Sequence, residues 1–260
     1  MTSSSPKLGA SLMASFLLGK AAGCGDTSTI IGLLDGVEVG PRLDASAAVA
    51  SAAEKGHIEA IRMLLPFYEH GYQNSTALRL AARHGSLEMF ELLRPYSNAQ
   101  DASSCLAEAA ECGHTEIVHR LLPIYASCDN DSIALVMAAR KGHLDIVRLL
   151  LPVSNPKAQK SAALCGACAG GFASVVELLL PLSNPEDFVS AMACAVANKE
   201  LEIGMMFYDR CDLVAVQRLL IKQGVHDENN MVAKLMSAKQ AQDLRAQTQH
   251  ANGSDRTRRL

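Results

Sequence analysis

The chain has 260 residues, enough for one or two domains with a sizeable core, and it carries 39 alanines against six phenylalanines, five tyrosines and no tryptophan. This composition favours closely packed short helices over a β-sandwich or barrel, because those folds prefer β-branched and aromatic residues. A net charge of −3 excludes the basic balance typical of nucleic-acid binders, and no apolar run approaches the roughly 20 residues that cross a bilayer.

The N-terminal segment contains a sequence that imitates a lipoprotein signal. An apolar stretch at 12–18 is followed by Ala-Ala-Gly-Cys at 21–24. Lys20 lies between the two, where such signals avoid charge, so we predict that this segment is not a signal peptide. The Ser-rich residues before it predict a disordered N-terminus over residues 1–15.

From residue 16 to residue 210 the sequence repeats with a period of about 29 residues. Alanine pairs mark each repeat, and in six repeats a glycine follows the pair by three residues, while Lys199 takes that position in the seventh. A fixed period in this range indicates stacked supersecondary units. The pairs begin at Ala21, Ala52, Ala81, Ala109 and Ala138, and Ala167-Cys168 and Ala195-Val196 continue the series.

Residues 132–152 illustrate the structure expected of one repeat. Ser132 predicts an N-cap for a first helix, and Gly142 predicts its left-handed C-terminal cap. A second, largely apolar helix follows and ends before Pro152, because proline disfavours helical geometry at the preceding residue. Each repeat is therefore predicted to be helix, tight turn, helix and loop. The position of Ser132 is taken in other repeats by Ser46, Ser75, Ser103 and Ser161.

The C-terminal part departs from the period. Spaced apolar residues over 211–246 predict helices that cap the array, since a terminal repeat needs a polar outer face. Residues 247–260 are polar and rich in arginine, and this composition predicts a disordered tail.

These landmarks resemble the ankyrin repeat. The motif Ala-Ala-x-x-Gly-His-x-Glu-x-Val-x-x-Leu-Leu reads through residues 109–122, and through 138–151 with an aspartate in place of the glutamate. The resemblance implies an all-α solenoid of about seven helix-turn-helix repeats, with structural histidines after the glycine at His57, His114 and His143. The period is shorter than the 33 residues usual in the family, and Ser-x-Ala-Leu replaces Thr-Pro-Leu-His. We therefore expect the projecting β-hairpin fingers to be short or absent.

Two variable positions follow directly after each alanine pair. The resemblance implies that the chain binds a protein partner through its concave inner-helix face, without enzyme activity and without a cofactor. We call these repeated positions the ladder. The ladder carries both positive and negative side chains, whereas a nucleic-acid groove would be uniformly basic. The predicted partner-binding residues are Glu54, Lys55, Arg83, His84, Glu111, Cys112, Arg140 and Lys141.

The expected setting is a cytoplasmic monomer that does not contact membranes. The linker Leu-Pro-x-Ser-Asn-Pro occurs at 151–156 and 180–185. It resembles linkers of ankyrin arrays from bacteria and from large viruses of protists. That resemblance implies an effector that is delivered into a host cell cytosol and acts on host proteins.

The cysteines provide an alternative function of a different class. Cys165 and Cys168 have the spacing of thiol-redox motifs and of half a zinc site, so a thiol-redox or metal-binding protein is the alternative. A redox motif requires a strand leading into its helix, whereas these residues fall on the predicted first helix of a repeat, with Cys168 in an alanine position. We interpret the eight cysteines as reduced thiols of a cytosolic protein.

Overall fold

The computed structural model describes residues 5–35, 45–68, 74–96, 99–125, 132–224, 230, 232–237 and 240–241. Every regular element within these ranges is a helix, so the predicted all-α fold class is confirmed. None of the helices described is long and apolar enough to cross a membrane. The chain divides into two compact units, residues 1–134 and 135–260.

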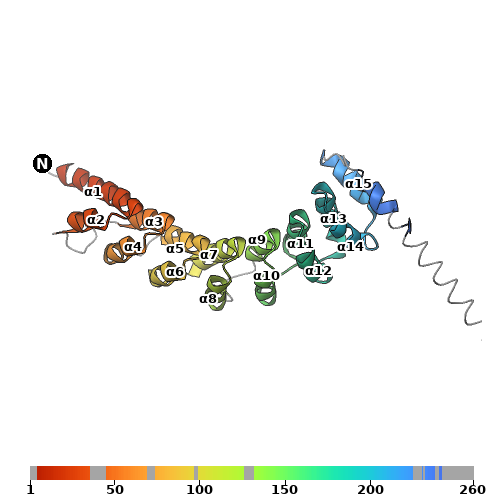
Figure 1. The fold of residues 1–260 in the computed structure, drawn as a ribbon, viewed down its shortest axis with the longest axis horizontal. Helices are drawn as coiled ribbons and strands as arrows, with labels where there is room; N and C mark the ends of the chain where they lie inside the picture. Colours follow the sequence, from red (N-terminus) through yellow and green to blue (C-terminus); the bar gives the residue numbers. More distant parts are fainter. Residues whose placement is uncertain are drawn as a thin grey trace, which may run out of the picture. The chain divides into compact units, whose positions relative to one another are not determined.

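The N-terminal unit stacks four helix pairs. The first helices α1, α3, α5 and α7 pack side by side, and the second helices α2, α4, α6 and α8 form another row (Figure 1). The short 3-10 helices η1 (Leu65–Phe67) and η2 (Arg94–Tyr96) follow α4 and α6. In order, α1 to α8 span Ser5–Cys24, Thr27–Leu34, Ser46–Lys55, Ile58–Leu64, Asn74–His84, Leu87–Leu93, Ala99–Cys112 and Thr115–Tyr125.

The C-terminal unit is built from helix pairs of the same kind. The first helices α11 and α13 pack side by side with α15, and the second helices α10, α12 and α14 form another row (Figure 1). Residues 232–237 are also helical, and Leu235 packs against α14 at Gly204. In order, α9 to α15 span Ile133–Lys141, Leu144–Leu150, Ala158–Gly170, Ala173–Leu179, Phe188–Ala197, Leu201–Phe207 and Leu213–Lys222, and η3 to η5 span Leu151–Val153, Leu180–Leu182 and Pro185–Asp187.

Helical structure extends beyond the repeats at both ends of the array. Helix α1 begins at Ser5, so residues 5–15 are helical where the sequence predicted disorder. Pro6 lies in the first turn of this helix, where a missing N–H costs no hydrogen bond, and good helix formers follow it. The predicted capping segment 211–246 contains α15 and the helical residues 232–237, whereas the predicted tail 247–260 lies outside the described residues.

The alanine pairs bring neighbouring first helices close together. Both members of the pairs at 52–53, 81–82, 109–110 and 138–139 are wholly buried. Because alanine has no atoms beyond Cβ, the backbones can approach, and a β-carbon added to Gly23 would lie only 3.6 Å from Cβ of Ser51. Larger side chains of the second helices, such as Ile61, Leu64 and Phe90, are buried around these contacts.

The predicted left-handed caps are present at the end of every first helix from α1 to α13. The six glycines have φ between 69° and 83°, and Lys199 has φ 68° at the corresponding position after α13. A left-handed conformation costs an L-residue with a β-carbon roughly 1–2 kcal/mol, so Lys199 is strained where the other repeats carry glycine.

We expect Lys199→Gly to raise the free energy of unfolding by up to about 1 kcal/mol, because the relief of backbone strain exceeds the entropy that glycine adds to the unfolded chain. Urea denaturation measures this change. Lys199→Ala keeps the β-carbon and should leave stability nearly unchanged. A glycine variant that is less stable than the alanine variant would contradict the assigned backbone conformation.

The predicted roles of the serines and prolines need two corrections. Ser46 and Ser103 lie inside α3 and α7 and are not N-caps, and Ala45 occupies the N-cap position of α3. The buried Ser161 instead donates a 2.7 Å hydrogen bond to the Asp187 carboxylate of the next repeat, so this serine ties two repeats together. Pro123 lies inside α8 and does not end it, whereas α10 ends before Pro152 as predicted.

Candidate functional site

The eight residues of the predicted ladder lie in the last turns of four first helices. Glu54 and Lys55 end α3, Arg83 and His84 end α5, and Glu111 and Cys112 end α7, all within the N-terminal unit. Arg140 and Lys141 end α9. Seven of these residues are exposed and Glu111 is half-buried, so their side chains are accessible at helix ends that the repeat geometry fixes.

The register between neighbouring first helices follows one rule. The residue directly after the alanine pair of one helix lies against the residue directly before the pair of the next. In the N-terminal unit, Gly23 faces Ser51 in this way. In the C-terminal unit, a β-carbon added to Gly166 would lie 3.3 Å from Cβ of Arg140. The ladder position therefore lies at the contact between two neighbouring first helices.

Glu108 occupies the same register and was not identified from the sequence. Its carboxylate lies 3.6 Å from the Arg79 guanidinium and 4.0 Å from that of Arg83, so two cations of α5 flank one anion of α7. Lys55 pairs with its neighbour Glu54 at 3.3 Å. For Arg140, the structure shows no ion pair within the part of the chain that it describes. Cations at these C-terminal helix ends also interact favourably with the helix dipole.

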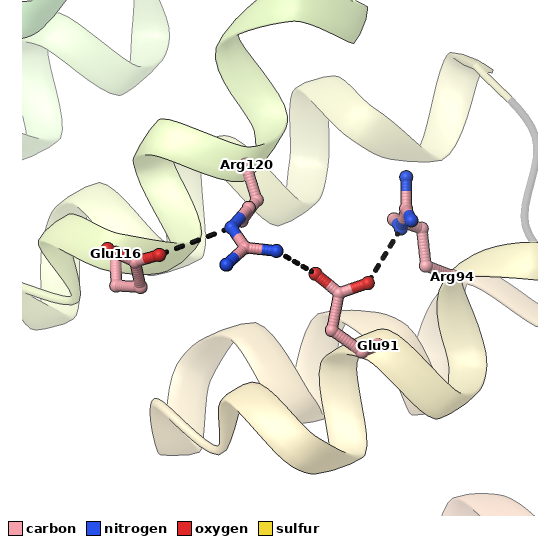
Figure 2. Close-up of polar contacts among 4 residues, drawn as sticks. All are labelled: Glu91, Arg94, Glu116 and Arg120. Atoms are coloured by element: carbon pink, nitrogen blue, oxygen red, sulfur yellow. Dashed lines mark hydrogen bonds and ion pairs between the residues drawn. The ribbon is translucent and has the colours of Figure 1, made fainter.

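The second helices of the N-terminal unit carry a network of ion pairs. Figure 2 shows the Glu91 carboxylate between Arg94 and Arg120, and Arg120 also contacts Glu116. The N–O distances of these ion pairs are 3.1, 3.0 and 3.2 Å respectively. Because Glu91 lies on α6 and Arg120 on α8, this network joins two neighbouring second helices. Most of the charged groups on this face therefore already have partners within the protein.

The thiols of the Cys-x-x-Cys motif differ in their surroundings. Cys165 and Cys168 both lie on α11, where Cys165 is half-buried and Cys168 is wholly buried. The Cys165 thiol donates a hydrogen bond to Cys194 of α13, and this bond together with burial raises the pKa of Cys165 well above its usual range. The same bond lowers the pKa of Cys194, and burial raises the pKa of Cys168.

Metal binding has no support in the geometry of these side chains. Among the described residues, no group of three or more histidine, cysteine, aspartate or glutamate side chains is placed to hold a metal ion. The structure thus places Cys165 next to Cys194 of the following repeat, and it places Cys168 in the tightly packed contact between helices.

A family model for ankyrin repeats, made of three copies of the repeat, matches residues 18–104 and again residues 106–191. The chain belongs to the ankyrin-repeat family. Ankyrin repeats are generally protein–protein interaction modules. No curated protein matches the chain. The predicted fold, a solenoid of ankyrin-like helix pairs, is confirmed by this match and by the stacked helix pairs of each unit.

In four repeats of this ankyrin array, the residue after the left-handed cap reaches back to the preceding repeat. His114 Nε2 lies 2.9 Å from the carbonyl oxygen of Arg83, so the predicted hydrogen-bonding role of this histidine is confirmed. The His57 ring packs against Gly25 in the same manner. Phe172 and Glu200 replace histidine in later repeats and contact Gly142 and Gly171 respectively. These side chains support the turns and do not converge on a catalytic site.

The loops between repeats test the prediction that the β-hairpin fingers are short or absent. The described linkers at 154–157 and 183–184 contain bends, a turn at 156–157 and no strand. The other linkers of this kind, at 36–44, 69–73, 97–98 and 126–131, lie outside the described residues. In the described linkers, no hairpin precedes the first helix.

Proposed function

We propose that this ankyrin array binds a protein partner through the ladder at the ends of its first helices. The proposal rests on one observation: exposed charged side chains recur at the ends of successive first helices. The alanine contacts and the left-handed caps hold these helix ends in place. A surface that is already ordered before binding loses little conformational entropy on association, and this lowers the cost of forming a complex.

The charges of the ladder support a protein as the partner. Glu54 and Glu111 alternate with Arg83 and Lys55 along the N-terminal unit, so the ladder offers both signs of charge. A nucleic-acid backbone selects clusters of lysine and arginine without intervening carboxylates. A polypeptide segment carrying both acidic and basic side chains matches the mixed pattern, and such complementarity acts mainly on the association rate and on specificity.

We expect Arg140→Glu to slow association with the partner about tenfold at low ionic strength, with a smaller effect on dissociation. The partner is first captured with the intact chain and identified by mass spectrometry. Its association rate with each variant is then measured by surface plasmon resonance at several salt concentrations. Arg83→Glu should have a similar effect, although it also removes the contact with Glu108.

Arg148→Glu on α10 is the matched control. It makes the same charge reversal on an exposed side chain of the adjacent second helix, on the other row of helices. Glu91 is unsuitable as a control because its reversal would break two ion pairs. If Arg148→Glu slows association while Arg140→Glu does not, the partner binds the second helices and the proposed face is wrong.

A further inference from the structure

Cys165 and Cys194 occupy the positions in the C-terminal unit that hold an ion pair in the N-terminal unit. Arg79 lies two places before its alanine pair, and Glu108 lies directly before the next pair, 3.6 Å away. Cys165 likewise lies two places before the pair at 167–168, and Cys194 directly before the pair at 195–196. The shared repeat register therefore places these two thiols against each other across neighbouring helices.

Two other positions of the repeat show that neighbouring first helices approach closely enough in this array for short side chains to meet. An added β-carbon at Gly166 would lie 3.3 Å from Cβ of Arg140, and one at Gly23 would lie 3.6 Å from Cβ of Ser51. Disulfides join residues whose β-carbons are about 3.5–4.5 Å apart. Helices α11 and α13 pack side by side, and the Cys165 thiol donates its hydrogen bond to Cys194.

We propose that Cys165 and Cys194 are a redox-sensitive modification site, at which a peroxide oxidises the two thiols to a disulfide that joins α11 to α13. The Cys194 thiolate attacks one oxygen of the peroxide, the O–O bond breaks, and a sulfenic acid forms with release of hydroxide. The Cys165 sulfur then attacks the Cys194 sulfur and displaces the hydroxyl group, which leaves as water with the Cys165 proton. Two thiols and one hydrogen peroxide thus give one disulfide and two waters.

The environment of each thiol supports this division of roles. Cys194 accepts the hydrogen bond from Cys165, and this lowers the pKa of Cys194 and increases the fraction of reactive thiolate. Both residues are half-buried and can be reached by a molecule as small as hydrogen peroxide. Cys168 is wholly buried in an alanine position, so it is a poor competitor for the same reaction.

The link can be mapped in the full chain. No lysine or arginine lies between Lys160 and Lys199, so trypsin leaves all three thiols in one peptide. A glutamyl endoprotease also cleaves after Glu177 and Glu186 and separates Cys194 from the other two. After treatment with hydrogen peroxide and alkylation of the remaining thiols, we expect mass spectrometry to find these two fragments joined. Dithiothreitol should release them.

Three single variants identify the residues. Cys194→Ser and Cys165→Ala should each abolish the linked fragments, whereas Cys168→Ala restores the alanine of the other repeats and should retain the link. Oxidation should also raise the melting temperature of the wild-type chain but not that of Cys165→Ala, because only a disulfide constrains the unfolded chain. The proposal is overturned if Cys165 and Cys194 stay free to alkylation while the exposed Cys112 is oxidised. It is equally overturned if the link survives Cys165→Ala.

Discussion

Replacing Leu150 by alanine is expected to lower the free energy of unfolding by about 2–5 kcal/mol. Leu150 lies on α10 with no exposed surface, and α10 packs against α12 of the next repeat. Truncation of a wholly buried leucine removes its transfer free energy and leaves a cavity that the surrounding helices only partly fill. Urea denaturation followed by circular dichroism measures the loss.

Two substitutions on the same helix control for this result. Leu149 is half-buried, so Leu149→Ala should cost clearly less than Leu150→Ala, and the exposed Arg148→Ala should change stability by no more than about 0.5 kcal/mol. Each repeat of a solenoid contacts mainly its neighbours, so hydrogen exchange in Leu150→Ala should increase first in α10 and α12. Equal losses for Leu149 and Leu150 would show that the buried face of α10 is assigned incorrectly.

The parts of the fold that the sequence predicted are those set by local chemistry repeated many times. A glycine can form a left-handed cap because its own backbone allows that conformation, whatever surrounds it. An alanine pair allows a neighbouring helix to pack closely because its side chains are small. The period therefore identified even Lys199 as a cap position, although lysine by itself gives no such indication.

The features that the sequence did not reveal depend on contacts between side chains of different repeats. Serine often caps helices, so the sequence predicts a cap at Ser161. In the structure the Ser161 hydroxyl instead donates a hydrogen bond to Asp187 of the next repeat. Residues 159–161 also have positive φ, and nothing in the letters Gln-Lys-Ser indicates this conformation. The contacts of Glu108 likewise depend on how α5 and α7 are aligned along their axes. The repeat period indicates this alignment but does not define it.

We expect Gly85→Ala to lower the free energy of unfolding by about 2–5 kcal/mol, from two separate causes. Gly85 has φ 71°, so any β-carbon costs roughly 1–2 kcal/mol of backbone strain. That β-carbon would also overlap the His114 ring, and displacing a packed side chain typically costs about 1–3 kcal/mol. Movement of the ring would break the hydrogen bond between His114 and the carbonyl group of Arg83.

Gly56→Ala separates the two causes. Gly56 has nearly the same backbone conformation, with φ 77°, but a β-carbon added there meets no atom within 4 Å. Gly56→Ala should therefore cost only the backbone strain of about 1–2 kcal/mol, and the difference between the two variants measures the contact with His114. In a His114→Ala background the ring is absent, so the cost of Gly85→Ala should fall to that of Gly56→Ala. If the two variants are equally destabilised in the wild-type background, the histidine does not hold this turn, and its recurrence at His57, His114 and His143 needs another explanation.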